Sequence, residues 1–594
     1  MRKMRPISGR VLFFVTSPRS PLKMIPEIKL LTENFTGQKW SPNTQERFMN
    51  VLFQEPFFKN VEKPKDPALS ARDRINRAPK ALGFVELYPM VRLTEPGRQL
   101  LDEDLSQEAL LRQILKFQIP SPFHVENKKI AGTYFVKPYL EMIRLIDSLE
   151  TISFDELMLF GMQLTDYRKF DTIIAKINKF RAERKICGQN YRTFFGNYVE
   201  NEILAIYKKE IDRGDVKTRE SNDRSLKRFI ETKRKNLRDY ADACFRYLRA
   251  TGLVTISQRR HTISIMKDKQ VEVSYYLKHI GRSPVFIDDE KSYKTYLYDA
   301  TQPVLFSDNR ELLESYAKEH KIDITLDTPK LKKAIKLETE KKRNQIIKES
   351  VGRLKSHASD DYADVINVFA DIKAKNLYDI PLMLEWNTWR AMTMLDGGEI
   401  NANLKFDDEG QPLSTAAGNM ADIICEYDDF NLTVEVTTSS GAKQFEMEGE
   451  PIARHLAKLK KEKGKTAYCF FIAPTISEAS IAYCYTMYRI NLAFYAGTTE
   501  IIPLNLDTFI EMVNQTEECG YTPQSDKIKK LCEYAKEKAN TSINETDWFN
   551  DVQQKARKWL ANDSIHTNEY TFQSQELALV AENKASYNSE NDME

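Results

Sequence analysis

The chain has 594 residues, of which 41% are hydrophobic and 29% are charged, as in a soluble protein with about three or four domains. Its formal net charge is only +2, so affinity for a polyanion has to come from local clusters of cations. The seven cysteines include no CxxC pair, which fits a reducing compartment and argues against a zinc site. No segment approaches the roughly 20 apolar residues of a membrane span, and the apolar run after the basic start is too short for a signal peptide. We therefore expect an intracellular protein without a membrane anchor.

The N-terminal segment Arg10–Pro21 reads RVLFFVTSPRSP and predicts a short strand followed by a rigid Ser/Pro/Arg loop. Arg19 in this loop is a candidate phosphate contact. A plain surface turn accounts for the same residues, because Pro and Ser favour turns.

A first winged helix-turn-helix is predicted at about 40–105. A basic helical stretch (Ala68–Ala81), a glycine stop, two short apolar strands and a helix capped by Thr94 follow one another in the order of that motif. A solvated helix face accounts for the charges equally well. The candidate DNA contacts are Arg72, Arg74, Arg77 and Lys80.

The same order recurs at about 215–285. Ser225–Ala250 predicts a long helix with cations on one side and an apolar stripe on the other, and Val254–Ile265 predicts a hairpin with a basic turn. Such a pair suits DNA, because cations neutralise phosphates while side chains reach base edges. Residues 1–290 are therefore predicted to be a largely α-helical DNA-recognition region. Its candidate contacts here are Arg228, Lys235, Arg238, Arg246, Arg259 and Arg260.

The second half begins with a predicted helical linker at 291–376, in which Lys330–Lys355 reads as a solvated spacer helix. Residues 377–562 then predict a helix, two strands, a helix and a further strand, as in a mixed α/β sheet. Glu385 lies in the first of these helices among apolar neighbours, so it requires a surface position or a cationic partner. The polar, acidic stretch 563–594 predicts disorder.

Within this last domain, Asn419–Tyr427 and Phe430–Thr437 alternate apolar with polar residues and predict an antiparallel hairpin that turns at 428–429. Counting back from that turn places Asp422 opposite Glu435, with apolar residues meeting on the other face. Two adjacent carboxylates repel each other unless a cation lies between them, and Mg²⁺ is an oxygen-preferring ion that needs few protein ligands. Two exposed acids on a solvated sheet face are the alternative.

The acids in neighbouring strands, with a Glu-bearing helix before them and another helix after, resemble the PD-(D/E)xK nuclease fold. Further motifs make the chain similar to the AlwI family of Type IIS restriction endonucleases and their nicking relatives. They extend from residue 17 to residue 474 in the order of the predicted domains. The motifs are SPRSP, SARDR…GFV, IETKRKNLRDYADA…TGL, AAGNMAD, EVTTSSGAKQFEMEGEPIARH and FIAP.

The resemblance implies an N-terminal half that recognises a short asymmetric site in double-stranded DNA, and a C-terminal nuclease that cuts a few base pairs downstream. It implies that Asp422, Glu435 and the carbonyl of Val436 hold one or two Mg²⁺ ions, which activate water and leave 5′-phosphate and 3′-hydroxyl ends. Glu448 and His455 match further catalytic positions on the next helix, although a lone histidine on an amphipathic helix is as readily structural.

One position departs from the broader nuclease pattern. The residue two places after the second acid is usually Lys, and here it is Thr437. Lys443, Gln444 and His455 are therefore candidates to help activate water. Arg454 receives no chemical role.

The resemblance also implies partners: double-stranded DNA, a transient homodimer through the nuclease domains, and a cognate DNA methyltransferase that shares the restriction-modification system without binding the chain. It implies a location in the bacterial cytoplasm. Three other functions compete with a double-strand-cutting enzyme. They are a strand-specific nicking endonuclease of the same family, a non-catalytic winged-helix DNA-binding regulator, and a structure-specific repair nuclease.

Overall fold

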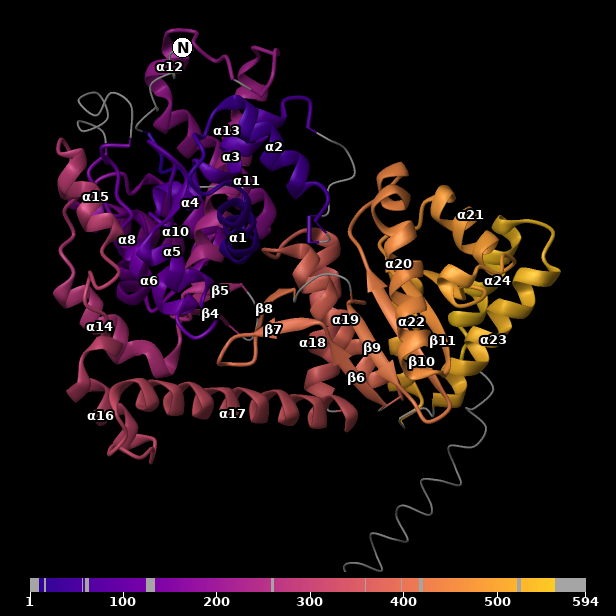
Figure 1. Cartoon of the computed structure of the whole chain (residues 1–594). Coiled ribbons are helices and arrows are strands. Elements are labelled where there is room, and N and C mark those ends of the chain that lie inside the picture. The colour runs from indigo at the N-terminus through magenta and orange to yellow at the C-terminus, as the bar shows by residue number, and fades with distance from the viewer. Residues whose placement is uncertain are drawn as a thin grey trace, which may run out of the picture. The chain divides into compact units, whose positions relative to one another are not determined.

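The computed structural model describes residues 10–14, 18–55, 57–58, 64–123, 134–218, 220–257, 261–357, 359–396, 398–415, 420–520 and 525–560. The described chain is mostly helical and divides into two compact units. The first unit comprises Met1–Asn344 with Phe406–Leu413, and the second comprises Gln345–Lys405 with Ser414–Glu594 (Figure 1). None of the described helices is both long and apolar enough to cross a membrane. The predicted division at 290 and 376 stays a prediction, and the stretch 563–594 lies outside the described residues.

The first unit is built mainly from helices, with two small sheets. The helices and strands of its first part are α1 (Met24–Phe35), α2 (Pro42–Leu52), α3 (Pro67–Ile75), α4 (Ala78–Ala81), β1 (Val85–Glu86), β2 (Arg92–Leu93), α5 (Glu95–Leu101), α6 (Ser106–Lys116), α8 (Pro138–Leu149), β3 (Thr151–Ser153) and α9 (Phe154–Leu159). Those that follow are α10 (Phe170–Ile186), α11 (Tyr191–Ile206), α12 (Lys208–Asp212), α13 (Leu226–Ala250), β4 (Val254–Ile256), β5 (Thr262–Ile265), α14 (Gln270–His279), α15 (Glu290–Tyr298) and α16 (Arg310–Glu319).

The strand predicted near the N-terminus is wrong for the described residues 10–14, which lie in no strand. Residues 10–14 pair with no strand among the described residues. Instead the backbone N–H of Leu12 donates to the Met162 carbonyl at 2.6 Å, and the Leu12 side chain is fully buried. Burial of its apolar side chains, rather than a sheet, holds this segment in place.

The elements predicted for the first winged unit form, with one difference. Thr94 caps α5 by accepting from the Gly97 N–H at 3.1 Å, and β1 pairs with β2 in antiparallel fashion. Gly97 is required, because a Cβ there would lie 2.1 Å from the Phe84 carbonyl oxygen. The single helix predicted over 68–81 is two helices, α3 and α4, because Pro79 has no N–H to continue a helix but suits the first turn of a new one. The winged-helix assignment itself stays a prediction.

The second predicted unit also forms its helix and hairpin. Ser225 caps α13 by accepting from the Arg228 N–H at 3.2 Å, and β4 pairs with β5 in antiparallel fashion. The hairpin is joined by the three-residue strand β3, which the sequence did not predict, to give a sheet of order β3-β5-β4. The basic turn at 258–260, which includes Arg259 and Arg260, lies outside the described residues.

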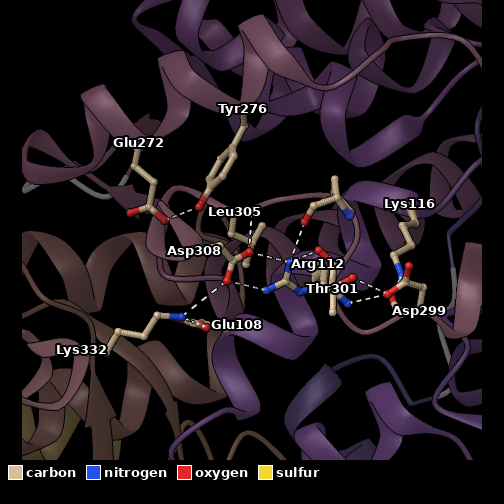
Figure 2. Close-up of polar contacts among 11 residues, drawn as sticks. Glu108, Arg112, Lys116, Glu272, Tyr276, Asp299, Thr301, Leu305, Asp308 and Lys332 are labelled. Atoms are coloured by element: carbon tan, nitrogen blue, oxygen red, sulfur yellow. Dashed lines mark hydrogen bonds and ion pairs between the residues drawn. The ribbon is translucent and has the colours of Figure 1, made fainter. Parts of the chain in front are cut away.

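A polar network ties α6 to the irregular segment after α15 (Figure 2). The buried guanidinium of Arg112 donates to the carbonyls of Thr301 and Pro303 and to the Asp308 carboxylate, at 2.6–3.2 Å. The ammonium of Lys116 donates to the Asp299 carbonyl at 2.6 Å and to two further carbonyls of α15. Irregular backbone has few internal partners for its carbonyls, so these two cations satisfy groups that would otherwise be buried unpaired.

Lys116 gives the first unit a pH-dependent stability. Burial lowers the pKa of Lys116 to about 7, whereas in the unfolded chain a lysine keeps its proton to about pH 10.4. The unfolded state therefore binds more protons between these values, so the free energy of unfolding should rise with pH from about 7 to 10. We expect the melting temperature of the wild type to gain on that of Lys116→Met as pH rises from 6.5 to 9.5 in scanning calorimetry. A constant difference would contradict the shift.

The second unit carries the mixed sheet that the sequence predicts (Figure 1). The strand order is β12-β11-β10-β9-β6; β10, β11 and β12 run parallel, whereas β9 is antiparallel to β10 and to β6. Every residue of the central strand β10 is buried, and α19, α20 and α22 pack against the sheet. The strands are β6 (Glu399–Ala402), β7 (Leu404–Phe406), β8 (Pro412–Thr415), β9 (Ile423–Glu426), β10 (Phe430–Val436), β11 (Thr466–Ala473) and β12 (Ile501–Asn505).

The helices of the second half begin with α17 (Thr328–Lys355), which passes from the first unit into the second. Glu385 in α19, for which the sequence predicts a surface position or a cationic partner, is partly exposed. The remaining helices are α18 (Ser359–Ala374), α19 (Ile380–Asp396), α20 (Ala442–Lys463), α21 (Glu478–Met487), α22 (Leu506–Glu518), α23 (Ser525–Thr541) and α24 (Glu545–Ala556).

Candidate active site

The hairpin of β9 and β10 has the register that the sequence predicts. Ile423 pairs with Val434 and Cys425 with Leu432, and these four side chains are fully buried. The Tyr427 N–H donates to the Phe430 carbonyl at 3.1 Å, which closes the turn at 428–429. The register that buries the apolar face is therefore confirmed, and its next step sets residue 422 opposite residue 435.

Asp422 lies just before β9 and is fixed to the end of β10. One carboxylate oxygen accepts a hydrogen bond from the Val436 backbone N–H at 2.9 Å, and the Asp422 carbonyl accepts from the Asn403 N–H at 2.8 Å. Its carboxylate thus lies beside the last two residues of the central strand. Asp422, Glu435 and Val436, the three residues predicted to bind metal, come together at one edge of the sheet.

Glu435 has a second partner, which comes from α20. Its carboxylate lies 2.7 Å from Nδ1 of His455, and each of the two residues is only 6% exposed. A histidine nitrogen bonded to a carboxylate donates its proton, and the bond fixes both the tautomer and the ring orientation. The structure therefore places His455 in hydrogen-bond contact with Glu435, one of the two candidate metal-binding acids.

Gln444 is occupied elsewhere. It is fully buried; its amide nitrogen donates to the carbonyls of Ser439 and Thr475, both at 2.9 Å, and its oxygen accepts from the Ser477 N–H at 2.8 Å. The side chain joins the loop after β10 to the loop after β11. Both the amide nitrogen and the oxygen of Gln444 are therefore engaged by the backbone, and the side chain has a structural role.

The remaining predicted residues of α20 lie nearer its start. Lys443 is exposed and Glu448 is half-buried. Both precede His455 along α20. Among the described residues, no three or more His, Cys, Asp or Glu side chains gather as a possible metal site, so Glu448 does not cluster with Asp422 and Glu435. Thr437, at the usual lysine position, is buried and accepts from the Ser439 N–H at 3.1 Å.

Several cations predicted to contact DNA are engaged within the first unit. Arg74 forms a buried ion pair with Glu27, whose pKa is raised by burial, and lies over the ring of Phe58. Lys80 lies 4.8 Å from the ring centroid of Phe123, and burial lowers the pKa of Lys80. Both cations are therefore engaged by side chains of the first unit itself.

The other two cations of the first winged unit lie nearer the surface. Arg77 pairs with Asp73 at 2.8 Å within the helical region, while Arg72 is exposed and donates to the Ala68 carbonyl at 3.3 Å. Arg72 is thus the predicted contact of this unit with the most solvent-accessible side chain.

The predicted cations on α13, and Arg19 beside it, divide into two groups. Arg19 and Arg246 both bind Asp242, at 3.4 and 2.9 Å, which holds the N-terminal loop against the helix. Arg228 pairs with Glu231 at the surface, at 3.2 Å. The second group consists of Lys235 and Arg238, which line a cavity of about 260 Å³ between α9, α11 and α13. Its lining residues are Asp155, Met158, Phe195, Glu231, Arg234, Lys235 and Arg238.

The cavity adds one cation to the predicted set. Arg234 is exposed beside Lys235 and Arg238 and lies 6.0 Å from the ring centroid of Phe195. The spacing of residues 234, 235 and 238 already indicates one helix face in the sequence. The sequence does not indicate that Arg234 lies near Phe195, because Phe195 comes from another helix. The three cations outnumber Asp155 and Glu231, the two acids that line the same cavity, so the cavity carries a net positive charge.

Comparison with known proteins identifies the family. The model of the AlwI restriction endonuclease family matches residues 80–512. The chain belongs to the AlwI restriction endonuclease family. The AlwI match includes α13 with its hairpin as well as β9, β10 and α20, so the cationic helix and the paired acids both lie within it. No curated protein matches the chain.

Three solved structures are similar to parts of this AlwI-family chain. The small subunit R.BspD6I2 of the heterodimeric restriction endonuclease R.BspD6I is 25% identical, with a TM-score of 0.26, over 34% of this chain and 96% of that one. The BpuJ1 endonuclease binding domain in complex with modified DNA is 12% identical, with a TM-score of 0.31, over 49% and 95%. The restriction endonuclease FokI is 10% identical, with a TM-score of 0.22, over 88% and 98%.

Proposed function

We propose that this protein is a Type IIS restriction endonuclease. It binds a short asymmetric site in double-stranded DNA through its N-terminal half and hydrolyses phosphodiester bonds a few base pairs downstream. The observation that carries the proposal is the pairing of Asp422 with Glu435 at the end of β10, with His455 bonded to Glu435, in a chain of the AlwI family.

The donors at this edge of the sheet suit Mg²⁺. Two carboxylates and the Val436 carbonyl are all hard oxygen ligands, and Mg²⁺ prefers few protein ligands of this kind together with water. When bound, the ion would lower the pKa of a coordinated water and stabilise charge that develops on the scissile phosphate. Asp422 and Glu435 would hold it, with the carbonyl of Val436 as the third ligand.

The chain's own groups prepare this site. The Val436 N–H donates to one oxygen of Asp422 and so orients its carboxylate. The His455 ring orients Glu435 through the hydrogen bond between Nδ1 and a carboxylate oxygen. Glu448 and Lys443, both accessible at the start of α20, are the residues that we propose to position the attacking water. The products would be 5′-phosphate and 3′-hydroxyl ends.

Recognition is assigned to two winged-helix-like units, one containing α3–α5 with β1–β2 and the other containing α13 with β4–β5. The exposed cations of α13 are proposed to lie along phosphates, where each neutralised phosphate releases counterions. The proposed partners are double-stranded DNA and, during cleavage, a second copy of the nuclease domain. A cognate methyltransferase would protect the same site without binding this chain.

The cations of α13 provide a separate test. The double variant Lys235→Ala/Arg238→Ala should bind the site about tenfold more weakly, and its plot of log K against log salt should be shallower by about one to two, because two phosphate contacts are lost. Fluorescence anisotropy over a salt series measures both. Lys179→Ala, an exposed cation on α10, is the matched control. An unchanged slope in the double variant would remove these residues from the interface.

The proposed activity is tested by digesting a sequenced supercoiled plasmid with Mg²⁺ and run-off sequencing both strands. Linear product with a fixed offset from one short asymmetric sequence is the expected result. Persistent open circles would assign a strand-specific nicking endonuclease instead. Site-specific binding without any cleavage would overturn the proposal in favour of a DNA-binding regulator, and cutting only at forks or flaps would favour a repair nuclease.

A further inference from the structure

The short hairpin of β7 and β8 has residues in both units. Strands β7 and β8 follow β6 and precede β9, both of which belong to the sheet of the second unit. The tip of the hairpin, Phe406–Leu413, nevertheless belongs to the first unit, while the residues on either side of it belong to the second. The hairpin is therefore covalently continuous with the candidate nuclease sheet and packed within the candidate recognition unit.

The tip is held by one buried carboxylate. Asp407 is 3% exposed and accepts from Nη2 of Arg249 at 2.8 Å and from the Thr255 hydroxyl at 2.9 Å. Its other oxygen accepts from the backbone N–H groups of Glu409 and Gln411, at 3.1 and 2.8 Å. Arg249 is also only 3% exposed. A buried carboxylate with this many donors strongly favours one geometry of the loop.

The partners of Asp407 come from the proposed DNA-binding elements. Arg249 is at the C-terminal end of α13, and Thr255 lies in β4 of the wing. Arg249 also donates to the Pro412 carbonyl at 2.6 Å, so it binds both sides of the hairpin tip.

Two weaker contacts surround this pair. The Asp408 carboxylate lies 3.2 Å from Arg343, and the Glu409 carboxylate accepts from the Lys267 backbone N–H at 3.1 Å. Both are partly exposed, whereas the Arg249–Asp407 pair is not, so the pair dominates the attachment of the tip.

The base of the hairpin reaches the candidate active site. Strand β6 pairs with β9, with Ala402 opposite Ile423. The next residue, Asn403, donates its backbone N–H to the Asp422 carbonyl at 2.8 Å. Only the three residues of β7 separate Asn403 from Asp407. One end of this short strand is therefore bonded to the acid proposed to bind metal, and the other end is followed directly by the carboxylate fixed to α13 and β4.

We propose that Arg249 and Asp407 are positioning residues for cleavage, which hold the β7–β8 hairpin, and through Asn403 the backbone of Asp422, in place while DNA is bound. They touch neither the metal-binding acids nor, by their burial, the DNA. The proposal rests on the proposed function, because it presumes that the sheet cuts DNA and that α13 binds it. A purely structural pair would affect stability alone.

The chain offers a matched control for that distinction. Arg112 and Asp308 form another Arg–Asp pair in the first unit, at 2.8 Å, in which the arginine is buried and the carboxylate is accessible (Figure 2). Asp308→Asn thus tests the loss of a similar pair without loosening the tip. Removing one partner of such a pair leaves the other charge uncompensated, so both variants should lower the melting temperature.

The test compares Asp407→Asn and Arg249→Lys with Asp308→Asn on a DNA fragment that contains the site. Binding is measured by anisotropy without divalent metal, and cleavage under single-turnover conditions with saturating protein and Mg²⁺. We expect both hairpin variants to bind within about threefold of the wild type but to cleave at least tenfold more slowly, with cuts at more than one offset in run-off sequencing. Asp308→Asn should cleave at the wild-type rate and at one offset.

If Asp407→Asn does not fold, Thr255→Val decides the question, because it removes a single hydrogen bond from Asp407 and keeps the side-chain volume. It should slow cleavage about threefold without weakening binding. Wild-type cleavage rates and a single offset in the folded hairpin variants would overturn the inference while leaving the proposed function intact. A wild-type protein that does not cut DNA would instead overturn the proposed function.

Discussion

Replacing Asp422 with Asn or Glu435 with Gln is expected to lower the rate of DNA cleavage by on the order of 10³-fold, while site binding stays within about threefold. Both changes keep the side-chain volume and remove a negative charge from the proposed metal site. Several kilocalories per mole of charge stabilisation by the ion would be lost with it, and each 1.36 kcal/mol corresponds to about tenfold in rate. Single-turnover cleavage and anisotropy, measured on the same preparations, separate the two effects.

Glu426→Gln is the matched control for this pair. Glu426 lies on the same hairpin as Asp422 but is bonded to Lys463 at 2.7 Å, away from the end of β10. Its loss should leave the cleavage rate near that of the wild type. Near wild-type cleavage by either the Asp422 or the Glu435 variant would show that the metal site lies elsewhere.

His455→Ala is expected to lower the cleavage rate by about 10–100-fold at low Mg²⁺, the range typical when a residue that orients a metal ligand is removed. The physical reason is the 2.7 Å bond to Glu435: without it, this buried carboxylate loses its orientation and its hydrogen-bond donor. His455→Asn should recover part of the rate, because the amide of Asn supplies an N–H near the position of Nδ1. Cleavage measured over a Mg²⁺ series tests both variants.

The Mg²⁺ series also distinguishes two roles of His455. If the ring acts by orienting Glu435, the Ala variant needs more Mg²⁺ for half-maximal rate and regains activity at high Mg²⁺. If the ring instead moves a proton in the reaction, the rate stays low at all Mg²⁺ concentrations and the half-maximal concentration is unchanged. The second result would contradict the positioning role.

The hairpin at the candidate site was predictable because its information is local. Alternation with period two, a two-residue turn and the need to bury one face together leave a single register, and the structure has it. The bond between His455 and Glu435 was only partly predictable. Helical spacing indicates the face of α20 that carries His455, but not which acid that face meets.

The roles of the cations were much less predictable. Arg74 looks in sequence like a member of a basic cluster and Arg19 like a loop cation, yet they bind Glu27, 47 residues away, and Asp239, 220 residues away. Arg249 continues the cation series of α13 and instead binds Asp407, 158 residues later. No local pattern encodes such partners, since they are set by the packing of distant elements. Strand β3 was not predicted, because its three residues are too few to show the alternation of apolar and polar side chains that indicates a strand.

The central proposal is that the turn at 428–429 brings Asp422 and Glu435 together to hold a divalent ion. The most direct measurement is anomalous diffraction from crystals of the protein soaked in Mn²⁺, which takes the same oxygen ligands as Mg²⁺. We expect an anomalous peak in direct coordination with the carboxylates of Asp422 and Glu435, beside the Val436 carbonyl. Mn²⁺ bound elsewhere in the second unit, with these two carboxylates uncoordinated, would contradict it.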